Sequence, residues 1–322
     1  MNGTQKGPDS MDGAAEEGYA LAIASGKGGV GKTTTAVNLG AAFVESGYTA
    51  AVLDFDLGMA NLGAMVGLTQ PNATIHDVLG GRAALDAALH EAGGLTIAPG
   101  STVLDHFADA ETDPIEGIVT ELKQRFDLVI LDAGAGLSQD IAVTLQAADG
   151  VLLVTTAELP ALTDASKTGE LVDRLAVPVV GAVFTGTGEG SLDDIEGVAT
   201  ALGTTGAVTV SIPADQHVKE SVRKGMPVVF DAESAPATVA YKRLATTLET
   251  DLGFDENAPD TEAGFEWVDP KSGNALPDDA QPGPVMEVPL ETLIEEAGLN
   301  ESPAVMGNGE RMLHQVRSWF GG

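Results

Sequence analysis

The sequence has no cysteine among its 322 residues. Disulfide bonds, thiolate metal sites, iron–sulfur clusters and cysteine nucleophiles are therefore excluded. The five histidines lack the HxxxH or HxH spacing that is typical of a zinc site. We find no run of eighteen predominantly apolar residues, and the polar N-terminus lacks the apolar core of a signal peptide. These absences predict a cytoplasmic protein.

Basic residues are also scarce. The chain has 16 Lys and Arg against 48 Asp and Glu, which gives a net charge of −32. Such a dense carboxylate surface is typical of proteins that stay soluble in concentrated salt, where the Debye length is only about 3 Å at 1 M. Binding to nucleic acid needs clustered Lys and Arg and weakens as salt rises. The charge balance therefore argues against a nucleic-acid partner.

Short apolar runs alternate with longer amphipathic segments from residue 19 to residue 252, after a polar segment, 1–18, that we expect to be disordered. The runs are continuously apolar, which is typical of strands buried on both faces of a parallel sheet. This alternation predicts an α/β fold with a doubly wound, mostly parallel sheet and helices on both faces. The expected strands are Tyr19–Ser25, Ala50–Leu53, Leu95–Ala98, Leu128–Leu131, Val151–Val154, Val179–Phe184 and Val208–Ile212. The expected helices are Thr33–Ser46, Asp140–Ala148, Asp164–Leu175, Leu192–Leu202, His217–Lys224 and Ala235–Leu252.

The composition changes after residue 252. Residues 251–310 hold 15 Asp and Glu, seven prolines and a single basic residue, Lys271. Such a segment buries too little apolar surface to offset its ordering entropy, so we expect 253–310 to be a flexible acidic linker. Within it, residues 288–299 have helical spacing and are a candidate docking helix. Residues 311–322 are expected to form a short amphipathic helix.

The strongest motif is a glycine-rich loop, Gly26-Lys27-Gly28-Gly29-Val30-Gly31-Lys32-Thr33, followed by Thr34. It matches GxxxxGK[ST] and lies between an expected strand and an expected helix, which is the context that this motif requires. Backbone N–H groups of such a loop surround phosphates, and the helix N-terminus adds partial positive charge. We assign these residues to nucleotide binding, with Lys32 on the β and γ phosphates and the Thr33 hydroxyl on Mg²⁺.

Lys27 places a second lysine inside the loop of a chain that has few lysines. With these surroundings the loop resembles the deviant Walker A loop of the MinD/ParA family of P-loop ATPases. The resemblance covers residues 19–252 and implies ATP and Mg²⁺ as cofactors. It also implies an ATP-dependent homodimer in which Lys27 contacts phosphates across the interface, so that Lys27 joins Lys32 as a catalytic residue.

Two acidic segments extend the resemblance. Asp54-Phe55-Asp56-Leu57-Gly58 is similar to the family's first switch segment, in which the second aspartate orients the attacking water. Asp56 therefore takes that catalytic role, and Asp54 supports the metal. Residues 126–132 form an apolar run that ends in Asp132, as in a Walker B segment, and Asp132 would hold a Mg²⁺-bound water. The expected metal site is Thr33, Asp54, Asp56 and Asp132.

The chain departs from the family pattern at two places. Ala60 stands where MinD proteins commonly have a basic residue, and Gly134 stands where the family usually has proline after the Walker B aspartate. Glycine is more permissive than proline, so we expect the loop that begins after Asp132, the second switch, to be more mobile or differently set. Hydrolysis is accordingly expected to be slow and to depend on a partner.

Three further residues are assigned to nucleotide binding by the same resemblance. Pro213 and Asp215 lie in a stretch similar to the family's base-pocket strand, and Thr185 follows the sixth expected strand. The family usually has an asparagine there that contacts the base. Preference for adenine is therefore implied by the resemblance alone.

The C-terminal segment carries five apolar residues on one helical stripe: Met312, Leu313, Val316, Trp319 and Phe320. MinD proteins end in a similar membrane-targeting helix. Burial of this face is worth only several kcal/mol, at about 1.5–3 for each side chain, so a single copy should bind weakly. Two copies in a dimer would gain by effective concentration. The alternative is docking on the chain's own domain or on a protein partner.

Taken together, these motifs predict a MinD-like ATPase whose cycle positions a cellular structure, such as a division site or a polar motility or chemosensory assembly. A protein partner or cargo adaptor is expected, with peripheral contact at the inner face of the cell membrane or the poles. One alternative is a ParA-like ATPase that partitions DNA or cargo, which should show a basic surface. Another is a nucleotide-binding scaffold with little hydrolysis.

Overall fold

The computed structural model describes residues 17–103, 111–188, 202 and 208–254. The strands are β1 (Tyr19–Ser25), β2 (Ala50–Phe55), β3 (His90–Ala92), β4 (Leu95–Ala98), β5 (Leu128–Ala135), β6 (Gly150–Thr156), β7 (Val179–Thr187) and β8 (Val208–Pro213). The longer helices are α1 (Lys32–Glu45), α6 (Ile115–Lys123), α7 (Gln139–Gln146), α8 (Leu159–Arg174), α10 (Gln216–Lys224) and α12 (Pro236–Leu252). Short helices are α2 (Leu62–Met65), α3 (Ile75–Leu79), α4 (Leu85–Ala88) and α11 (Val228–Asp231).

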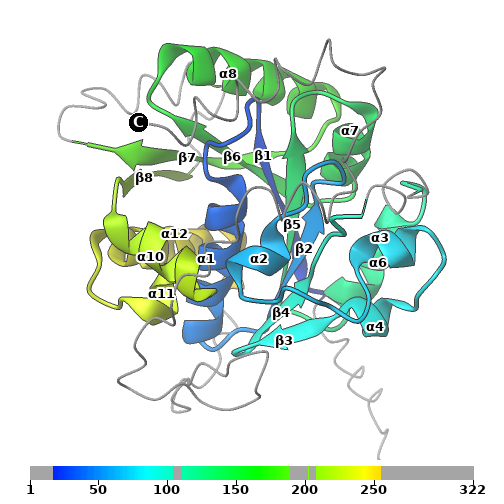
Figure 1. Cartoon of the computed structure of the whole chain (residues 1–322). Helices are drawn as coiled ribbons and strands as arrows, with labels where there is room; N and C mark the ends of the chain where they lie inside the picture. The colour runs from blue at the N-terminus through cyan, green and yellow to red at the C-terminus, as the bar shows by residue number, and fades with distance from the viewer. Residues whose placement is uncertain (1–16, 104–110, 189–201, 203–207, 255–322) are drawn as a thin grey trace, which may run out of the picture. The chain divides into compact units, whose positions relative to one another are not determined.

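The strands form one eight-stranded sheet in the order β3-β4-β2-β5-β1-β6-β7-β8 (Figure 1). Every neighbouring pair is parallel except β3 and β4. The sheet is therefore mostly parallel and doubly wound, as predicted, with β1 near its middle. In such sheets ligands bind at the carboxyl ends of the central strands, and the glycine-rich loop leaves β1 at that edge.

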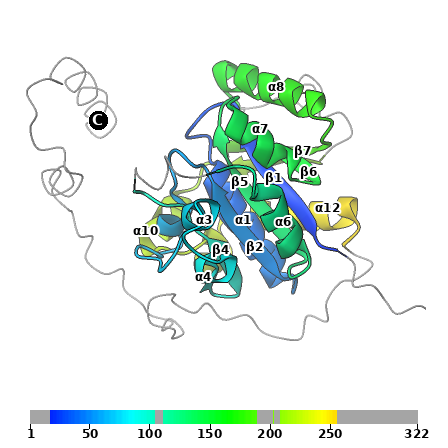
Figure 2. The same cartoon turned by 90° about the vertical axis from the view of Figure 1, so that its right-hand side faces the viewer.

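Two layers of helices cover the sheet. Helices α1, α11 and α12 lie on one face, while α6, α7 and α8 lie on the other, which Figure 2 turns toward the viewer. Along β1 the side chains alternate between these layers: Leu21 and Ile23 point toward α1, whereas Ala20, Ala22 and Ala24 point toward α6–α8. Burial on both faces explains why the strand sequences are continuously apolar.

All seven expected strands are present. The sequence reading missed β3, which pairs antiparallel with β4 through a turn at Gly93 and Gly94, both with positive φ. It also missed α6, although Ile115, Ile118, Val119 and Leu122 recur at helical spacing and are buried. Helix α8 begins at Leu159 rather than at Asp164. The expected helix at 192–202 lies outside the described residues except for Leu202.

The C-terminal helix α12 ends in a small aromatic cluster. Phe254 makes edge-to-face contacts with Phe43 and Tyr48, at ring-centre distances of 5.3 Å, and the Tyr48 hydroxyl donates to the Phe254 carbonyl. The packed domain thus extends two residues beyond the boundary that we expected at residue 252. At the other end, the Gly18 amide donates to the Lys123 carbonyl, so Gly18 is ordered rather than part of the disordered segment expected over 1–18.

The remaining predictions on the chain ends lie outside the described residues. They are the disorder of 1–16, the linker over 255–310, the candidate docking helix at 288–299 and the amphipathic helix at 311–322 with its five apolar residues. Among the residues that are described, no helix combines the length and the apolarity needed to cross a membrane.

The aromatic cluster yields a stability prediction. Replacing Phe254 by alanine removes its contacts with Phe43 and Tyr48, so we expect Phe254→Ala to lower the free energy of unfolding by about 1–3 kcal/mol. The control is Val239→Ala on the exposed side of α12, which should change the free energy of unfolding little. Denaturant unfolding measures both. Equal stability of Phe254→Ala and the wild-type protein would show that the domain ends before residue 254.

Candidate nucleotide site

The glycine-rich loop runs from the end of β1 to the start of α1. Gly29 and Gly31 have positive φ values of 76° and 92°, which other residues rarely adopt, and Gly31 is the N-cap of α1. A Cβ atom placed on Gly28 or Gly29 would meet nothing within 4 Å. The loop therefore has open space beside both of these glycines.

Neighbouring elements hold the loop in this shape. The Thr185 hydroxyl at the end of β7 bonds to the carbonyls of Val30, in the loop, and Thr155, in β6. At the loop's start, a Cβ on Gly26 would lie 2.2 Å from the Asp164 carbonyl oxygen, so only glycine permits this approach of α8. Thr185, which the sequence assigned to nucleotide binding, is thus placed to position the loop.

The cationic and hydroxyl groups of the motif differ in exposure. Lys32 is only 7% exposed at the first position of α1, whereas Lys27 is exposed. Thr33 and Thr34 are half-buried at the N-terminal turn of the same helix. Lys32 is therefore held at the centre of the loop, and Lys27 faces outward, where a second molecule could reach it.

Two acidic side chains meet at the carboxyl edge of the sheet. Asp54 in β2 and Asp132 in β5 are paired in register on neighbouring parallel strands, and both are essentially fully buried. Neither carboxylate oxygen of Asp132 has a hydrogen-bond partner within the protein. Burial and the nearby Asp54 charge raise the pKa of Asp132 to about 8, although the nearby Thr33 hydroxyl and the Lys32 charge favour its charged form. An unsatisfied buried carboxylate of this kind fits a cation or its bound water.

Asp54 is occupied by the backbone of the first switch segment. One of its oxygens accepts from the Asp56 amide at 3.2 Å, and the other accepts from the amides of Asn61 and Leu62 at 3.0 Å. Burial raises the pKa of Asp54 to about 6, although these three hydrogen bonds favour the charged form. Asp54 is therefore placed to shape the switch segment.

Asp56 lies at the opening of that segment and is half-buried. Its carboxylate accepts from the Met59 amide at 3.1 Å, which leaves its second oxygen available to a water molecule. A Cβ on Gly134 would lie 3.6 Å from this carboxylate. Gly134 belongs to β5, in which Ala133 pairs with Phe55 and Ala135 pairs with Ser25, so this end of the second switch continues the sheet.

The described residues contain no group of three or more acidic or histidine side chains that could hold a metal ion by itself. Mg²⁺ commonly binds through one or two carboxylates, with the remaining positions filled by water and substrate phosphates. The unpartnered Asp132 and the Thr33 hydroxyl at the start of α1 fit that pattern. Two other residues were expected at the metal site. Asp56 accepts a hydrogen bond from the Met59 amide, and Asp54 accepts hydrogen bonds from amides of the first switch segment.

A cavity of about 600 Å³ adjoins the loop. It is lined by Gly29, Val30 and Gly31 from the loop, by Thr34 from α1, by Thr156, Thr185 and Gly186 from β6 and β7, and by residues 212–216, Val218, Lys219, Arg223 and Tyr241. The structure thus brings together Thr185, Pro213 and Asp215, three of the residues that the sequence assigned to the nucleotide. The cavity's size is typical of a small-ligand site.

The Asp215 carboxylate serves the protein rather than the cavity. It caps α10 by accepting from the His217 amide at 2.9 Å, and it accepts from the Ala237 amide of α12 at 3.0 Å. Its burial raises the pKa, but the hydrogen bonds from Ala237 and His217 outweigh this effect and hold the pKa below its usual value. Asp215 therefore fixes the cavity wall, and its contribution to binding is positional.

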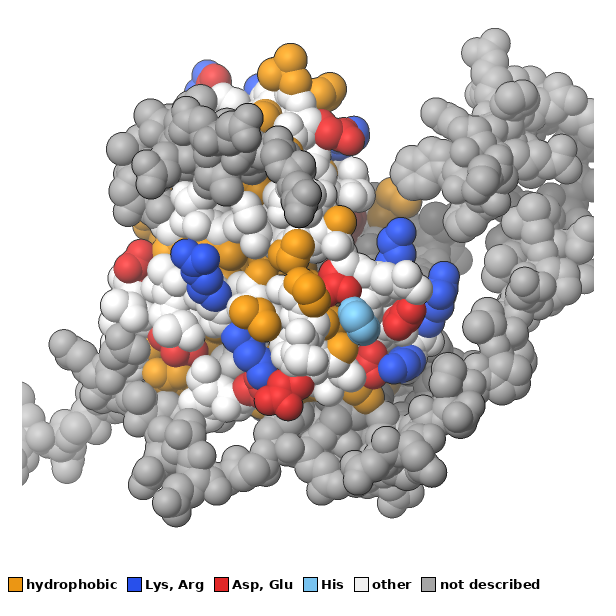
Figure 3. All heavy atoms as spheres, turned by 90° about the vertical axis from the view of Figure 1, so that its left-hand side faces the viewer, with side chains coloured by type: hydrophobic (Ala, Val, Ile, Leu, Met, Phe, Trp, Pro, Cys, Tyr) orange, Lys and Arg blue, Asp and Glu red, His pale blue; other side chains and the backbone are white. Residues whose placement is uncertain are grey.

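Sequence reasoning missed two basic side chains of the cavity, Lys219 and Arg223. They lie one turn apart on α10. The sequence feature that could have predicted them is this pair of basic residues at positions i and i+4, directly after the base-pocket stretch. Figure 3 shows this side of the domain, where Lys and Arg side chains are scattered among acidic and hydrophobic ones. No continuous basic patch is visible on that face.

Exposed hydrophobic side chains gather at the same edge of the sheet. Five large ones are exposed in the described part of the chain. Four of them follow the carboxyl ends of strands on either side of β1: Val103 after β4, Met59 after β2, Leu137 after β5 and Leu159 after β6. Met59 is 79% exposed and Leu159 is 76% exposed. This edge, which surrounds the glycine-rich loop, has the character of a contact surface.

Comparison with known proteins agrees with this geometry. Residues 21–228 match the family described as the CobQ/CobB/MinD/ParA nucleotide binding domain. An ATP-binding protein of Methanocaldococcus jannaschii is 34% identical over 71% of this chain and 87% of its own length. The septum site-determining protein MinD of Bacillus subtilis is 32% identical over 71% and 88%. MinD from Pyrococcus horikoshii, solved with Mg-ADP, has a TM-score of 0.68 at 29% identity and covers 73% of this chain and 98% of that one.

The buried Asp132 yields a prediction on pH and stability. In the unfolded chain an aspartate loses its proton near pH 4, whereas Asp132 in the folded protein keeps it up to about pH 8. The folded state therefore loses stability from this group as pH rises from about 4 to about 8. Without nucleotide and with a metal chelator, Asp132→Asn should show a smaller fall in Tm between about pH 5 and about pH 8 than the wild-type protein.

The exposed Asp173→Asn is the control for this comparison, since it removes one carboxylate without changing the buried pair. We expect its Tm to follow the wild-type pH dependence. If Asp132→Asn and Asp173→Asn gave the same pH profile, the buried carboxylate would not carry the effect.

Proposed function

The chain belongs to the MinD/ParA family of P-loop ATPases, and from this premise we propose that it binds ATP with Mg²⁺, dimerises and hydrolyses ATP to position a cellular structure. The observation that carries the proposal is the unpartnered, buried carboxylate of Asp132 beside a glycine-rich loop that opens into a cavity of about 600 Å³. The Mg-ADP bound to the Pyrococcus horikoshii relative supports the same pair of ligands here.

Each group would have one task in the reaction. The loop amides and Lys32 bind the phosphates, while the Thr33 hydroxyl and Asp132 hold Mg²⁺ or its bound water. The metal would neutralise the charge that develops on the transferred phosphoryl group. The second oxygen of Asp56 orients the attacking water in line with the scissile bond. Phosphoryl transfer needs little more from the protein than this positioning and charge compensation.

We expect the dimer interface to form at the hydrophobic edge around the glycine-rich loop. Val103, Met59, Leu137 and Leu159 are exposed there, and the exposed Lys27 faces out of the same edge. A second copy that met this edge would cover the four side chains and would bring its own Lys27 close to the bound phosphates. Because the interface would include the nucleotide, dimerisation would depend on ATP.

The proposed role in positioning a cellular structure is supported by a relative's role, and the charge of the chain argues against the alternative of DNA partitioning. The Bacillus subtilis relative is a septum site-determining protein, and the M. jannaschii relative is an ATP-binding protein. ParA-like partitioning of DNA would need a basic surface, and the net charge of −32 does not favour it. A protein partner that contacts the second switch beyond the end of β5 would set the rate of hydrolysis and release the dimer.

An ATPase assay in molar salt tests the proposal. We expect Asp56→Ala to bind ATP, to accumulate as a dimer with Mg²⁺, and to hydrolyse ATP about a hundredfold more slowly or worse, because its water is no longer oriented. Steady-state phosphate release and light scattering measure the two effects, with Asp173→Asn as the control. Equal rates for Asp56→Ala and the wild-type protein would favour a nucleotide-binding scaffold.

We further propose that residues 311–322 bring the ATP-bound dimer to a membrane surface through Met312, Leu313, Val316, Trp319 and Phe320. Flotation with liposomes tests this. With Mg²⁺ and ATP, the double variant Trp319→Ala/Phe320→Ala should lose binding, whereas Arg311→Ala/Arg317→Ala should keep most of it, because molar salt screens the arginines. If the wild-type protein shows no ATP-dependent flotation, the segment contacts a protein partner or its own domain instead.

A further inference from the structure

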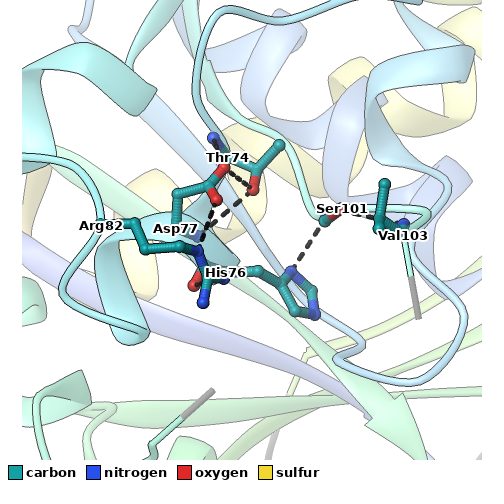
Figure 4. A network of polar contacts seen from close by, with 6 residues as sticks. All are labelled: Thr74, His76, Asp77, Arg82, Ser101 and Val103. Atoms are coloured by element: carbon teal, nitrogen blue, oxygen red, sulfur yellow. Dashed lines mark hydrogen bonds and ion pairs between the residues drawn. The ribbon is translucent and has the colours of Figure 1, made fainter. Parts of the chain in front are cut away.

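His76 has a fully buried side chain, and none of the nucleotide-binding roles described above involves it. It lies in α3, and its ring joins two loops that follow neighbouring strands. Nε2 lies 3.0 Å from the carbonyl oxygen of Leu57, after β2, and Nδ1 lies 3.0 Å from the backbone nitrogen of Ser101, after β4. Figure 4 shows the ring next to Ser101, with the other residues of its network around it.

These two partners determine the tautomer of the ring. The Ser101 amide can only donate a hydrogen bond, so Nδ1 must accept it and cannot carry a hydrogen. Nε2 therefore carries the hydrogen and donates it to the Leu57 carbonyl. The imidazole is neutral and works as a donor on one side and an acceptor on the other.

The Leu57 carbonyl belongs to the segment that carries Asp56. Asp54 holds the amides of this segment from inside the sheet, and the Met59 amide closes a turn onto the Asp56 carboxylate. The hydrogen bond from His76 holds the residue directly after Asp56. The loop after β4 also packs closely here, since a Cβ on Gly100 would lie 2.4 Å from the Ala60 Cβ.

The backbone of His76 is itself firmly held. Thr74 and Asp77 form a capping box at the start of α3, and Arg82 donates to the Asp77 carboxylate and to the His76 carbonyl (Figure 4). The Ile75 amide donates to the Pro99 carbonyl in the loop after β4. The ring is thus attached to a support that does not depend on the switch segment.

We propose that His76 is a positioning residue for ATP hydrolysis: its neutral ring donates to the Leu57 carbonyl and thereby sets the direction of the Asp56 carboxylate. This inference rests on the proposed function, in which Asp56 orients the attacking water. A small misplacement of an orienting group costs far more in rate than in ligand binding, so the hydrogen bond acts on kcat.

The geometry of the ring provides a matched pair of variants. Gln places an amide N–H where Nε2 lies, so His76→Gln keeps the donor to Leu57 and loses the acceptor for Ser101. Asn places its oxygen where Nδ1 lies, so His76→Asn keeps the acceptor and loses the donor. We expect His76→Asn to lower kcat about 10- to 100-fold with an unchanged Kd for ATP, and His76→Gln to keep most of the wild-type rate.

Arg82→Gln is the control for loosening of α3, because Arg82 contacts the His76 carbonyl but not its ring. Because it leaves both hydrogen bonds of the ring in place, Arg82→Gln should lose much less rate than His76→Asn. Hydrogen exchange of residues 56–62 adds a readout that does not require hydrolysis: exchange should be faster in His76→Asn and unchanged in His76→Gln.

The outcomes separate the two proposals. A wild-type protein that does not hydrolyse ATP would refute the proposed function and, with it, a role of His76 in hydrolysis. Hydrogen exchange would still show whether the His76 ring holds residues 56–62 in place. If the wild-type protein hydrolyses ATP and the two His76 variants are equally active, or if Arg82→Gln loses as much rate as His76→Asn, the inference is overturned and the proposed function stands.

Discussion

A buried carboxylate without a partner is the constraint on which this site depends. Asp132 ends an apolar run at the centre of the sheet, next to Asp54 in register on β2, and no protein group satisfies either of its oxygens. A charge at this position would be removed from water without compensation, which is why burial raises the pKa of Asp132 and why the folded protein bears an energetic cost there near neutral pH. A site of this kind gains stability when a cation binds, which links occupancy of the site to the stability of the domain.

Polar side chains around Asp132 hold the neighbouring loops in fixed shapes. The Asp54 carboxylate accepts hydrogen bonds from three amides of the first switch segment, and the Thr185 hydroxyl donates to the carbonyl of Val30. Asp215 caps α10 and contacts α12. These side chains hold the groups that would touch a ligand, which is how a small number of polar contacts can preorganise a site.

Charge and apolar surface have separate roles in this chain. With a net charge of −32 the protein carries a strong negative field, which salt screens over a few ångströms at molar concentration. Recognition in such a medium has to rely on buried polar contacts and on apolar area. The four exposed hydrophobic side chains at the loop edge and the apolar stripe expected in residues 311–322 are both of this type.

The sequence by itself determined the order of the strands along the chain, the fold class and the glycine-rich loop, because these depend on local spacing and on continuous apolar runs. It also placed Asp54, Asp56 and Asp132 at strand ends. The sequence did not reveal that Asp54 is taken up by backbone amides, that Asp215 is a helix cap, or that His76 contacts Leu57, nineteen residues away. Only the tertiary structure decided these roles, because a carboxylate or imidazole is assigned by the atoms around it, and those atoms come from loops that meet only when parallel strands align.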